Sequence, residues 1–191
     1  MTQIPLFQPP SEWTPPEKIP DLSDAKEIAI DLETCDPSIK TKGPGWTRDE
    51  GFIAGVAIAV EGWKGYFPIR HEGGGNFDEK IIKRQVQRIM DLPCDKVFHN
   101  AAYDVGWLRW WGVEVKGKII DTLVAAPLID ENRFRYNLND LGRDYLKETK
   151  SEALLYEAAK EWGLDAKGEM YKLPPMYVGS YAEQDADLTL R

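Results

Sequence analysis

The sequence is poor in cysteine and in long apolar runs, and each shortage excludes a class of protein. Two cysteines, Cys35 and Cys94, are too few for a disulfide scaffold, so we expect a reduced, cytoplasmic setting. The longest apolar run, Gly51 to Val60, is about half the ~20 residues that a membrane helix needs. The N-terminus has neither a basic start nor an apolar signal core. We therefore expect neither a membrane partner nor export.

Basic residues are also in deficit. Lysine and arginine number 24 against 32 acidic residues, which gives a net charge of −8. This balance argues against a protein that grips long duplex DNA through a broad basic face. It does not exclude a cleft that takes a few terminal nucleotides, because carboxylates gathered at one site add to the acidic count and bound cations reverse the local field.

The apolar pattern predicts a single α/β domain with a mixed β-sheet flanked by helices. Strands are expected at 27–32, 52–60, 65–69, 96–99 and 119–120, and helices at 77–90, 102–111, 138–146, 151–162 and 178–191. Residues 1–20 hold six of the thirteen prolines and predict an extended arm, with Phe7 and Trp13 packed on the body. We expect an arm at 1–23 and the folded domain at 24–191.

The first acidic motif, Asp31-Leu32-Glu33, lies at the end of a predicted buried strand. Residues i and i+2 of a strand point to the same face, so both carboxylates leave the sheet together. Two adjacent anions repel unless a cation neutralises them, and hard oxygen ligands suit Mg²⁺ or Mn²⁺. A strand end that carries two solvated acids is the alternative.

Two further motifs place polar side chains one helical turn apart. Asn100 and Asp104 open one predicted helix, and Tyr181 and Asp185 lie in the last one, each pair separated by about 6 Å along the helix axis. The neighbours of Asp104 are mainly apolar, so that acid is awkward unless it faces a polar cleft. The alternatives are a helix cap at Asn100 and solvated helix faces elsewhere.

The three motifs, in this order, resemble the DEDD 3′–5′ exonucleases of the RNase H-like superfamily. Tyr181 follows Ser180 where the histidine subclass has its histidine, so the resemblance is to the tyrosine (DEDDy) subclass. The similarity is closest to the proofreading domain of family-A, polymerase I-type DNA polymerases and covers about 26–191. It extends to Thr34, Gly65–Ile69, His71, Asp121–Leu123, Leu138–Leu141, Tyr145-Leu146 and Ala186-Asp187.

The resemblance implies a metal-dependent exonuclease that releases 5′-mononucleotides from DNA 3′ ends. It implies catalytic roles for Asp31, Glu33, Asp104, Tyr181 and Asp185. The four acids among them would bind two divalent cations, Mg²⁺ or Mn²⁺, and Tyr181 would position the attacking water. Thr34 and Asn100 would contact the terminal nucleotide. Asp121 is expected to cap a helix or brace the site.

The implied substrate is a single-stranded DNA 3′ end, and a polymerase domain in cis or in trans is the expected partner. Only six residues follow Asp185, which favours an excised proofreading domain over a stand-alone phage-type exonuclease. Two alternatives stay open from the sequence. One is an RNase D-like enzyme that trims RNA 3′ ends, and the other is a nucleic-acid-binding scaffold that has lost catalysis.

Overall fold

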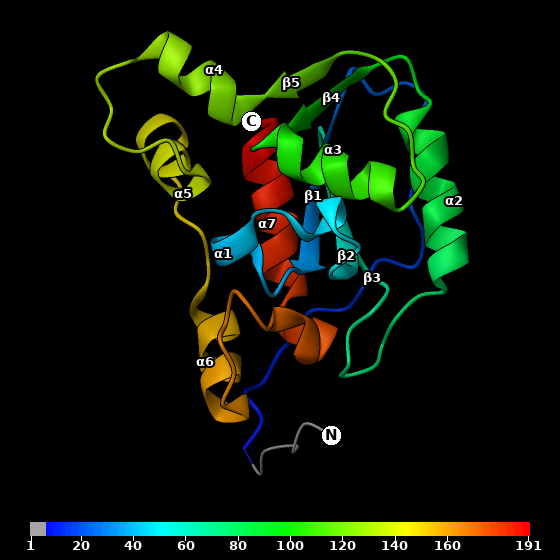
Figure 1. Cartoon of the computed structure of the whole chain (residues 1–191), viewed down its shortest axis with the longest axis vertical. Coiled ribbons are helices and arrows are strands. Elements are labelled where there is room, and N and C mark those ends of the chain that lie inside the picture. Colours follow the sequence, from blue (N-terminus) through cyan, green and yellow to red (C-terminus); the bar gives the residue numbers. More distant parts are fainter. Residues whose placement is uncertain (1–6) are drawn as a thin grey trace.

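The computed structural model describes residues 7–191, and its centre is a five-stranded sheet in the order β3-β2-β1-β4-β5 (Figure 1). The strands are β1 (Glu27–Cys35), β2 (Phe52–Val60), β3 (Trp63–Pro68), β4 (Asp95–Phe98) and β5 (Ile119–Asp121). β1 pairs antiparallel with β2 and parallel with β4, so the sheet is mixed, as predicted. No helix in residues 7–191 is long and apolar enough to cross a membrane.

Helices cover both faces of this sheet. The longer ones are α2 (Glu79–Met90), α3 (Ala101–Trp110), α4 (Thr122–Ile129), α6 (Ala153–Trp162) and α7 (Gly179–Leu190). Short helices are α1 (Ile39–Lys42), α5 (Leu138–Leu141) and the 3-10 turns at Gly45–Thr47, Met170–Lys172 and Pro175–Tyr177, and a π-helical segment (Gly142–Leu146) continues α5. In Figure 1, α7 (red) lies beside β1 in the centre of the view, α2 lies at the right, and α4 and α5 lie at the left.

The alternation of β1 assigns its side chains to two layers. Ile28, Ile30 and Leu32 pack into the core formed with α2 and α3. Ala29 packs into the second core, formed with α6 and α7. Since side chains alternate along a strand, Asp31 and Glu33 share the face of Ala29 and point toward α7. The sheet thereby directs both acids to the same side as the last helix.

Small side chains let α7 approach the sheet closely. Ala29 and Ala57 on the strands and Ala182 and Ala186 on α7 are all fully buried in one core. Short side chains on both surfaces reduce the distance between helix and sheet. This close approach brings the polar residues of α7 to the level of the acids of β1.

The N-terminal arm is partly fixed to the body, as predicted for Trp13. Its indole Nε1 donates to Glu183 Oε1 at 3.0 Å, and its ring covers Gly179, where an added Cβ would lie 2.0 Å from a ring atom. The prediction for Phe7 is wrong, because this side chain is 55% exposed. The boundary between arm and domain at 23 stays a prediction.

The predicted elements all occur, with shifts at their ends. β1 continues to Cys35, three residues beyond the predicted end, because Thr34 and Cys35 still pair with β2 after a register shift at Glu33. The segment predicted as one helix at 138–146 changes from α to π geometry at Gly142. Trp107, on α3, is fully buried.

Candidate active site

A cleft of about 380 Å³ opens between the end of β1, the start of α3 and the first half of α7. All seven residues that the sequence predicts for the site line it. The full lining is Asp31, Leu32, Glu33, Thr34, Asp36, Ile39, His99, Asn100, Tyr103, Asp104, Lys167, Gly168, Met170, Tyr181 and Asp185. The three motifs, which are up to 154 positions apart, thus meet at one place.

The two acids of β1 lie on the cleft side of the sheet, as their spacing predicts. Asp31 is partly exposed, and Glu33 is 7% exposed. Burial, with the nearby charge of Asp185, raises the pKa of Asp31 to about 7. Burial and the charge of Asp31 raise the pKa of Glu33 well above its usual range. Ionising both groups at neutral pH is therefore costly without a nearby cation.

Asp104 reaches the same acids from the first turn of α3. It is 4% exposed, and its Oδ1 accepts the backbone N–H of Leu32 at 3.2 Å, which fixes the carboxylate against β1. Burial and then the charge of Asp31 raise the pKa of Asp104 well above its usual range. Asp104 therefore belongs to the buried acidic group rather than to a solvated helix face.

The start of α3 is capped by a different residue from the one that the sequence suggested as an alternative. Asn100 has a left-handed backbone with φ of 74°, and its side chain makes no capping hydrogen bond. Asp121 instead accepts the N–H groups of Asn100 at 3.0 Å and Ala101 at 2.8 Å, and also that of Leu123 at the start of α4. Asp121 thus caps α4 and also holds the start of α3, which agrees with its predicted role as a helix cap. Asn100 lines the cleft with its side chain uncommitted to a cap.

Tyr181 and Asp185 lie one turn apart on α7 and both are buried, at 8% and 5% exposure. Burial, and then the charge of Glu33, raises the pKa of the Tyr181 phenol far above its usual range, so the hydroxyl stays protonated. Burial raises the pKa of Asp185, and the charge and hydrogen bond of Lys150, with the nearby Tyr181 hydroxyl, partly oppose this rise. The pair places a neutral O–H group beside the carboxylates.

Two lysines reach this cleft that sequence reasoning missed. Lys150 Nζ lies 2.6 Å from Asp185 Oδ2, in a pair whose side chains are 12% and 7% exposed. Lys167 Nζ lies 3.9 Å from the centroid of the Tyr181 ring and also pairs with Glu152 at 2.7 Å. Both lysines lie in irregular segments on either side of α6, where no periodicity marks them. They supply the nearest positive charge to the acidic group.

Thr34 takes part in a hydrogen-bonded wall of the cleft. Its Oγ1 lies 2.7 Å from Tyr103 Oη, which donates to Asp36 Oδ2 at 3.1 Å. Asp36 also accepts the N–H of Gly45 at 2.9 Å, so the wall is anchored beyond β1. His99, which also lines the cleft, is held by Thr122 Oγ1 at 2.8 Å.

The donor set fits a hard divalent cation. The acids offer carboxylate oxygens, which Mg²⁺ and Mn²⁺ prefer, and Asp185 Oδ1 is buried without a hydrogen-bond partner. Across residues 7–191, however, no three acidic, histidine or cysteine side chains are already gathered closely enough to enclose an ion. The ammonium group of Lys150 on Asp185 Oδ2 is part of this arrangement. Side-chain adjustment would therefore accompany metal binding.

Known proteins resemble this chain over most of its length. A DNA-directed DNA polymerase of Pseudomonas phage M6 is 38% identical over 196 residues, which cover 98% of this chain and 30% of the polymerase. DNA polymerase I of Synechocystis is 29% identical over 168 residues, which cover 85% of this chain and 15% of that enzyme. The chain thus spans less than a third of either relative.

Solved structures support the architecture. The structure of Brucella melitensis NrnC with bound Mg²⁺ superposes with a TM-score of 0.57 at 18% identity, over 90% of this chain and 72% of that one. This similarity supports the predicted RNase H-like fold, a mixed sheet with flanking helices. The family model for the 3′–5′ exonuclease of family-A DNA polymerases matches residues 14–191. The chain therefore belongs to the 3′–5′ exonuclease family found in family-A DNA polymerases.

Proposed function

We propose that the cleft hydrolyses the terminal phosphodiester of a single-stranded DNA 3′ end and releases 5′-mononucleotides. The proposed catalytic residues are Asp31, Glu33, Asp104, Tyr181 and Asp185. The observation that carries the proposal is the convergence of four carboxylates, three of them buried, and one buried phenol on a single cleft. Structural acids are rarely buried together, because their mutual repulsion destabilises the fold unless a ligand offsets it.

The four carboxylates would hold two divalent cations, Mg²⁺ or Mn²⁺. When bound, such ions supply the positive charge that lowers the pKa of a water molecule and stabilises the phosphate. Tyr181 remains protonated, so it orients the attacking water by hydrogen bonding and does not act as a general base. Lys167 over its ring holds the phenol in place. Thr34 and Asn100 lie on the wall where a terminal nucleotide would enter.

A DNA substrate is favoured over RNA because the relatives that resemble this sequence are DNA polymerases. The structural similarity to NrnC, at 18% identity, supports the fold alone. The RNA alternative is tested by hydrolysis rates on DNA and RNA oligonucleotides of one sequence, since the 2′-hydroxyl is the chemical difference between them. Faster hydrolysis of RNA would favour the RNase D-like function.

The proposed activity is tested with 5′-labelled single-stranded DNA in Mg²⁺ or Mn²⁺. We expect stepwise shortening from the 3′ end, which Asp31→Ala abolishes and which Glu157→Ala, a change at an exposed acid of α6, leaves intact. Activity that survives Asp31→Ala would refute the site. DNA binding and metal binding without any hydrolysis in the unaltered chain would favour the scaffold alternative.

The role of Tyr181 is tested separately. Tyr181→Phe keeps the ring beneath Lys167 and removes only the hydroxyl, so we expect kcat to fall by about 10- to 1000-fold. The Kd for single-stranded DNA should stay within about twofold. Equal losses in kcat and in DNA affinity would contradict a role in orienting water.

We also propose that the chain edits the product of a DNA polymerase, in cis or in trans, in the cytoplasm of a bacterial or phage-infected cell. The phage and bacterial polymerases that resemble it support this setting. A mismatched primer terminus frays and exposes a single strand, so its excision should be faster than that of a matched terminus. Equal excision rates on the two duplexes would contradict an editing role.

A further inference from the structure

The ion pair between Lys150 and Asp185 places a positive charge inside the acidic cleft. Lys150 Nζ lies 2.6 Å from Asp185 Oδ2, and the two side chains are 12% and 7% exposed. A carboxylate and an ammonium group so far from water are stable as a pair, because either charge alone is costly to bury. In the metal-free protein, Lys150 therefore supplies the charge that Asp185 needs.

The charge of Lys150 also acts on the other carboxylates of the cleft. Burial raises the pKa of both acids of β1 and of Asp185, and the charge of Lys150 lowers all three. Lys167 acts on the same carboxylates, but its ammonium pairs with Glu152 at 2.7 Å, outside the catalytic group. Of these two lysines, Lys150 is the one that binds a proposed metal ligand directly.

The backbone that carries Lys150 is held from two elements. Gln184, the residue before Asp185 on α7, accepts the N–H of residue 151 at 2.5 Å and donates to the carbonyl of residue 149 at 3.1 Å. Asn139 Oδ1, on α5, accepts the N–H of Lys150 itself at 3.2 Å. The main chain is therefore fixed on both sides of the lysine, while its long side chain keeps its rotatable bonds.

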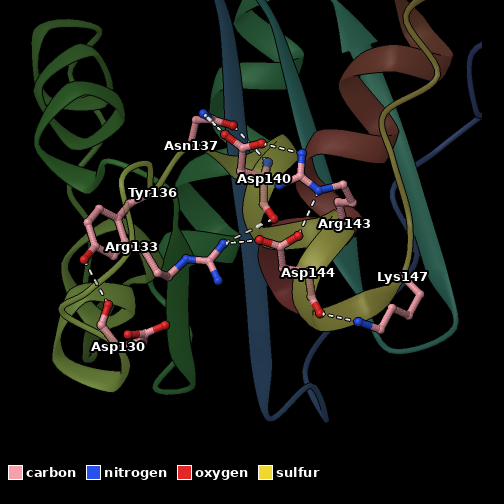
Figure 2. Close-up of polar contacts among 8 residues, drawn as sticks. All are labelled: Asp130, Arg133, Tyr136, Asn137, Asp140, Arg143, Asp144 and Lys147. Carbon is pink, nitrogen blue, oxygen red and sulfur yellow. Dashed lines mark hydrogen bonds and ion pairs between the residues drawn. The ribbon is translucent and has the colours of Figure 1, made fainter.

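The support that α5 gives to this segment is itself fixed by charged contacts. Figure 2 shows Arg143 between Asp140 and Asp144, to which it donates at 2.7 and 2.8 Å. Lys147 Nζ donates to the carbonyl of Asp144 at 2.9 Å, at the end of the π-helical segment. A change of partner at Asp185 therefore involves the Lys150 side chain and not the segment that carries it.

Lys150 and a divalent cation would compete for the same carboxylate. Asp185 is a ligand of the proposed metal site, and its other oxygen, Oδ1, is buried without a hydrogen-bond partner. A cation on one oxygen of a carboxylate is only a few ångströms from an ammonium on the other, and two positive charges at that separation repel strongly away from bulk water. The lysine side chain can move out to water, whereas the acids cannot, so the ammonium is the group that leaves.

We propose that Lys150 is a tethered counter-ion, which neutralises Asp185 in the empty site and which a divalent cation displaces. This inference rests on the proposed function and concerns its metal. Metal binding becomes the exchange of one ammonium for one divalent cation at Asp185. Lys150 is then a positioning residue that holds the empty site together and, by competing with the ion, lowers the affinity of the site for metal.

Calorimetric titration with Mn²⁺ in the absence of DNA tests the exchange. Lys150→Met removes the competing charge and keeps a long side chain, so the Kd for Mn²⁺ should fall by about 10- to 100-fold. Lys150→Gln, which can still donate a hydrogen bond to Asp185, should also lower the Kd and covers the case in which Lys150→Met does not fold. A merely structural role predicts the opposite sign, because a loosened site binds metal more weakly. An unchanged or higher Kd in the folded variants would overturn the proposal.

Lys167→Met is the matched control for the effect of charge at a distance. Lys167 acts on the same carboxylates without pairing with Asp185, so its removal should lower the Kd for Mn²⁺ by less than about threefold. Equal changes in Lys150→Met and Lys167→Met would reduce the effect to general electrostatics and overturn a direct exchange. Lys147→Met, at an exposed lysine, should leave the Kd unchanged.

Chemical labelling of the unaltered chain gives a readout that needs no substitution. In EDTA, reductive methylation should modify Lys150 slowly, because the ion pair buries its ammonium group. Saturating Mg²⁺ should raise this rate severalfold, as measured by mass spectrometry of the peptides. Lys147, which is exposed, is the internal reference and should react at the same rate in both conditions. A Lys150 rate that Mg²⁺ leaves unchanged would show that the ammonium stays on Asp185 and would overturn the proposal.

The outcomes distinguish this inference from the proposed function. If the chain shortens DNA in Mg²⁺, but the labelling of Lys150 and the Kd of its variants do not change, the exchange is overturned and the exonuclease is not. If Mn²⁺ binds more tightly to Lys150→Met and Mg²⁺ exposes Lys150, but DNA is never hydrolysed, the exchange is supported and the proposed catalysis fails.

Discussion

Replacing Asp31 by asparagine should make the metal-free protein more stable at pH 8. Burial and the charge of Asp185 raise the pKa of Asp31 from 3.8 to about 7, so the folded chain holds this proton more tightly than the unfolded chain does. Above pH 7 the carboxylate is ionised in both states. The folded state then bears the full free energy of holding this charge in a partly buried site beside Asp185. A shift of roughly three units at 1.36 kcal/mol each sets an upper limit of about 4 kcal/mol, because Asp31 keeps some contact with water.

The increase in the free energy of unfolding produced by Asp31→Asn must decrease as the pH falls. As the pH falls below 7, the folded protein takes up the proton first and the cost decreases, until it vanishes near the unfolded pKa of 3.8. At pH 4.5 the advantage of Asp31→Asn should therefore shrink to about 1 kcal/mol. His71 acts in the opposite direction, because burial lowers its pKa to about 4 and acid then destabilises the fold. This effect is common to both proteins, so the difference between them isolates Asp31.

The assay is urea unfolding in EDTA at pH 8 and pH 4.5, followed by tryptophan fluorescence. Asp24→Asn, a change at an exposed aspartate, is the control and should stay within about 0.5 kcal/mol of the unaltered chain. Added Mg²⁺ or Mn²⁺ should stabilise the unaltered chain at pH 8 more than Asp31→Asn, since the cation binds only the folded state. If Asp31→Asn raised the free energy of unfolding equally at both pH values, or not at all at pH 8, the ionised Asp31 would not destabilise the folded chain.

Two further substitutions test contacts that hold the site together. Trp13→Ala should lower the free energy of unfolding in urea by about 1–3 kcal/mol, because it leaves a cavity over α7 and removes the hydrogen bond to Glu183. The control Phe7→Ala, at an exposed ring, should change it by less than ~0.5 kcal/mol. Lys150→Met should destabilise the metal-free chain by about 3 kcal/mol at pH 8, because it leaves the Asp185 carboxylate buried and unpaired. That loss should decrease on acidification, whereas Lys147→Met, at an exposed lysine, should leave the unfolding curve unchanged at either pH.

The sequence predicted the fold and the acidic group because both depend on periodicity. The alternation of β1 placed Asp31 and Glu33 on one face, and the one-turn spacing placed Tyr181 and Asp185 on one side of α7, as the structure shows. The lysines were missed for the opposite reason. Long side chains in irregular segments reach several ångströms in directions that no residue spacing specifies, so only the folded chain reveals that Lys150 lies against Asp185.

The cap of α3 shows a second limit of local reasoning. Asn100 stands at the position where a capping residue is usual, and sequence alone offered it that role. The structure gives the cap to Asp121, which is 21 positions away and arrives through the parallel pairing of β4 with β5. A helix start next to a sheet edge can take its cap from the neighbouring strand, and this frees the local polar residue for the cleft.

The last motif shows how one helix turn supplies a side chain to the cleft and also holds the fold together. Asp185 faces the cleft, Ala182 packs on the sheet, and Glu183 accepts bonds from Trp13 and from the backbone of Tyr66. Gln184 binds the backbone on both sides of Lys150, accepting the N–H of residue 151 at 2.5 Å and donating to the carbonyl of residue 149 at 3.1 Å. The glutamine therefore fixes the segment from which Lys150 reaches Asp185. A buried acid is tolerable in this helix because the preceding residue, Gln184, fixes the segment whose lysine offsets its charge.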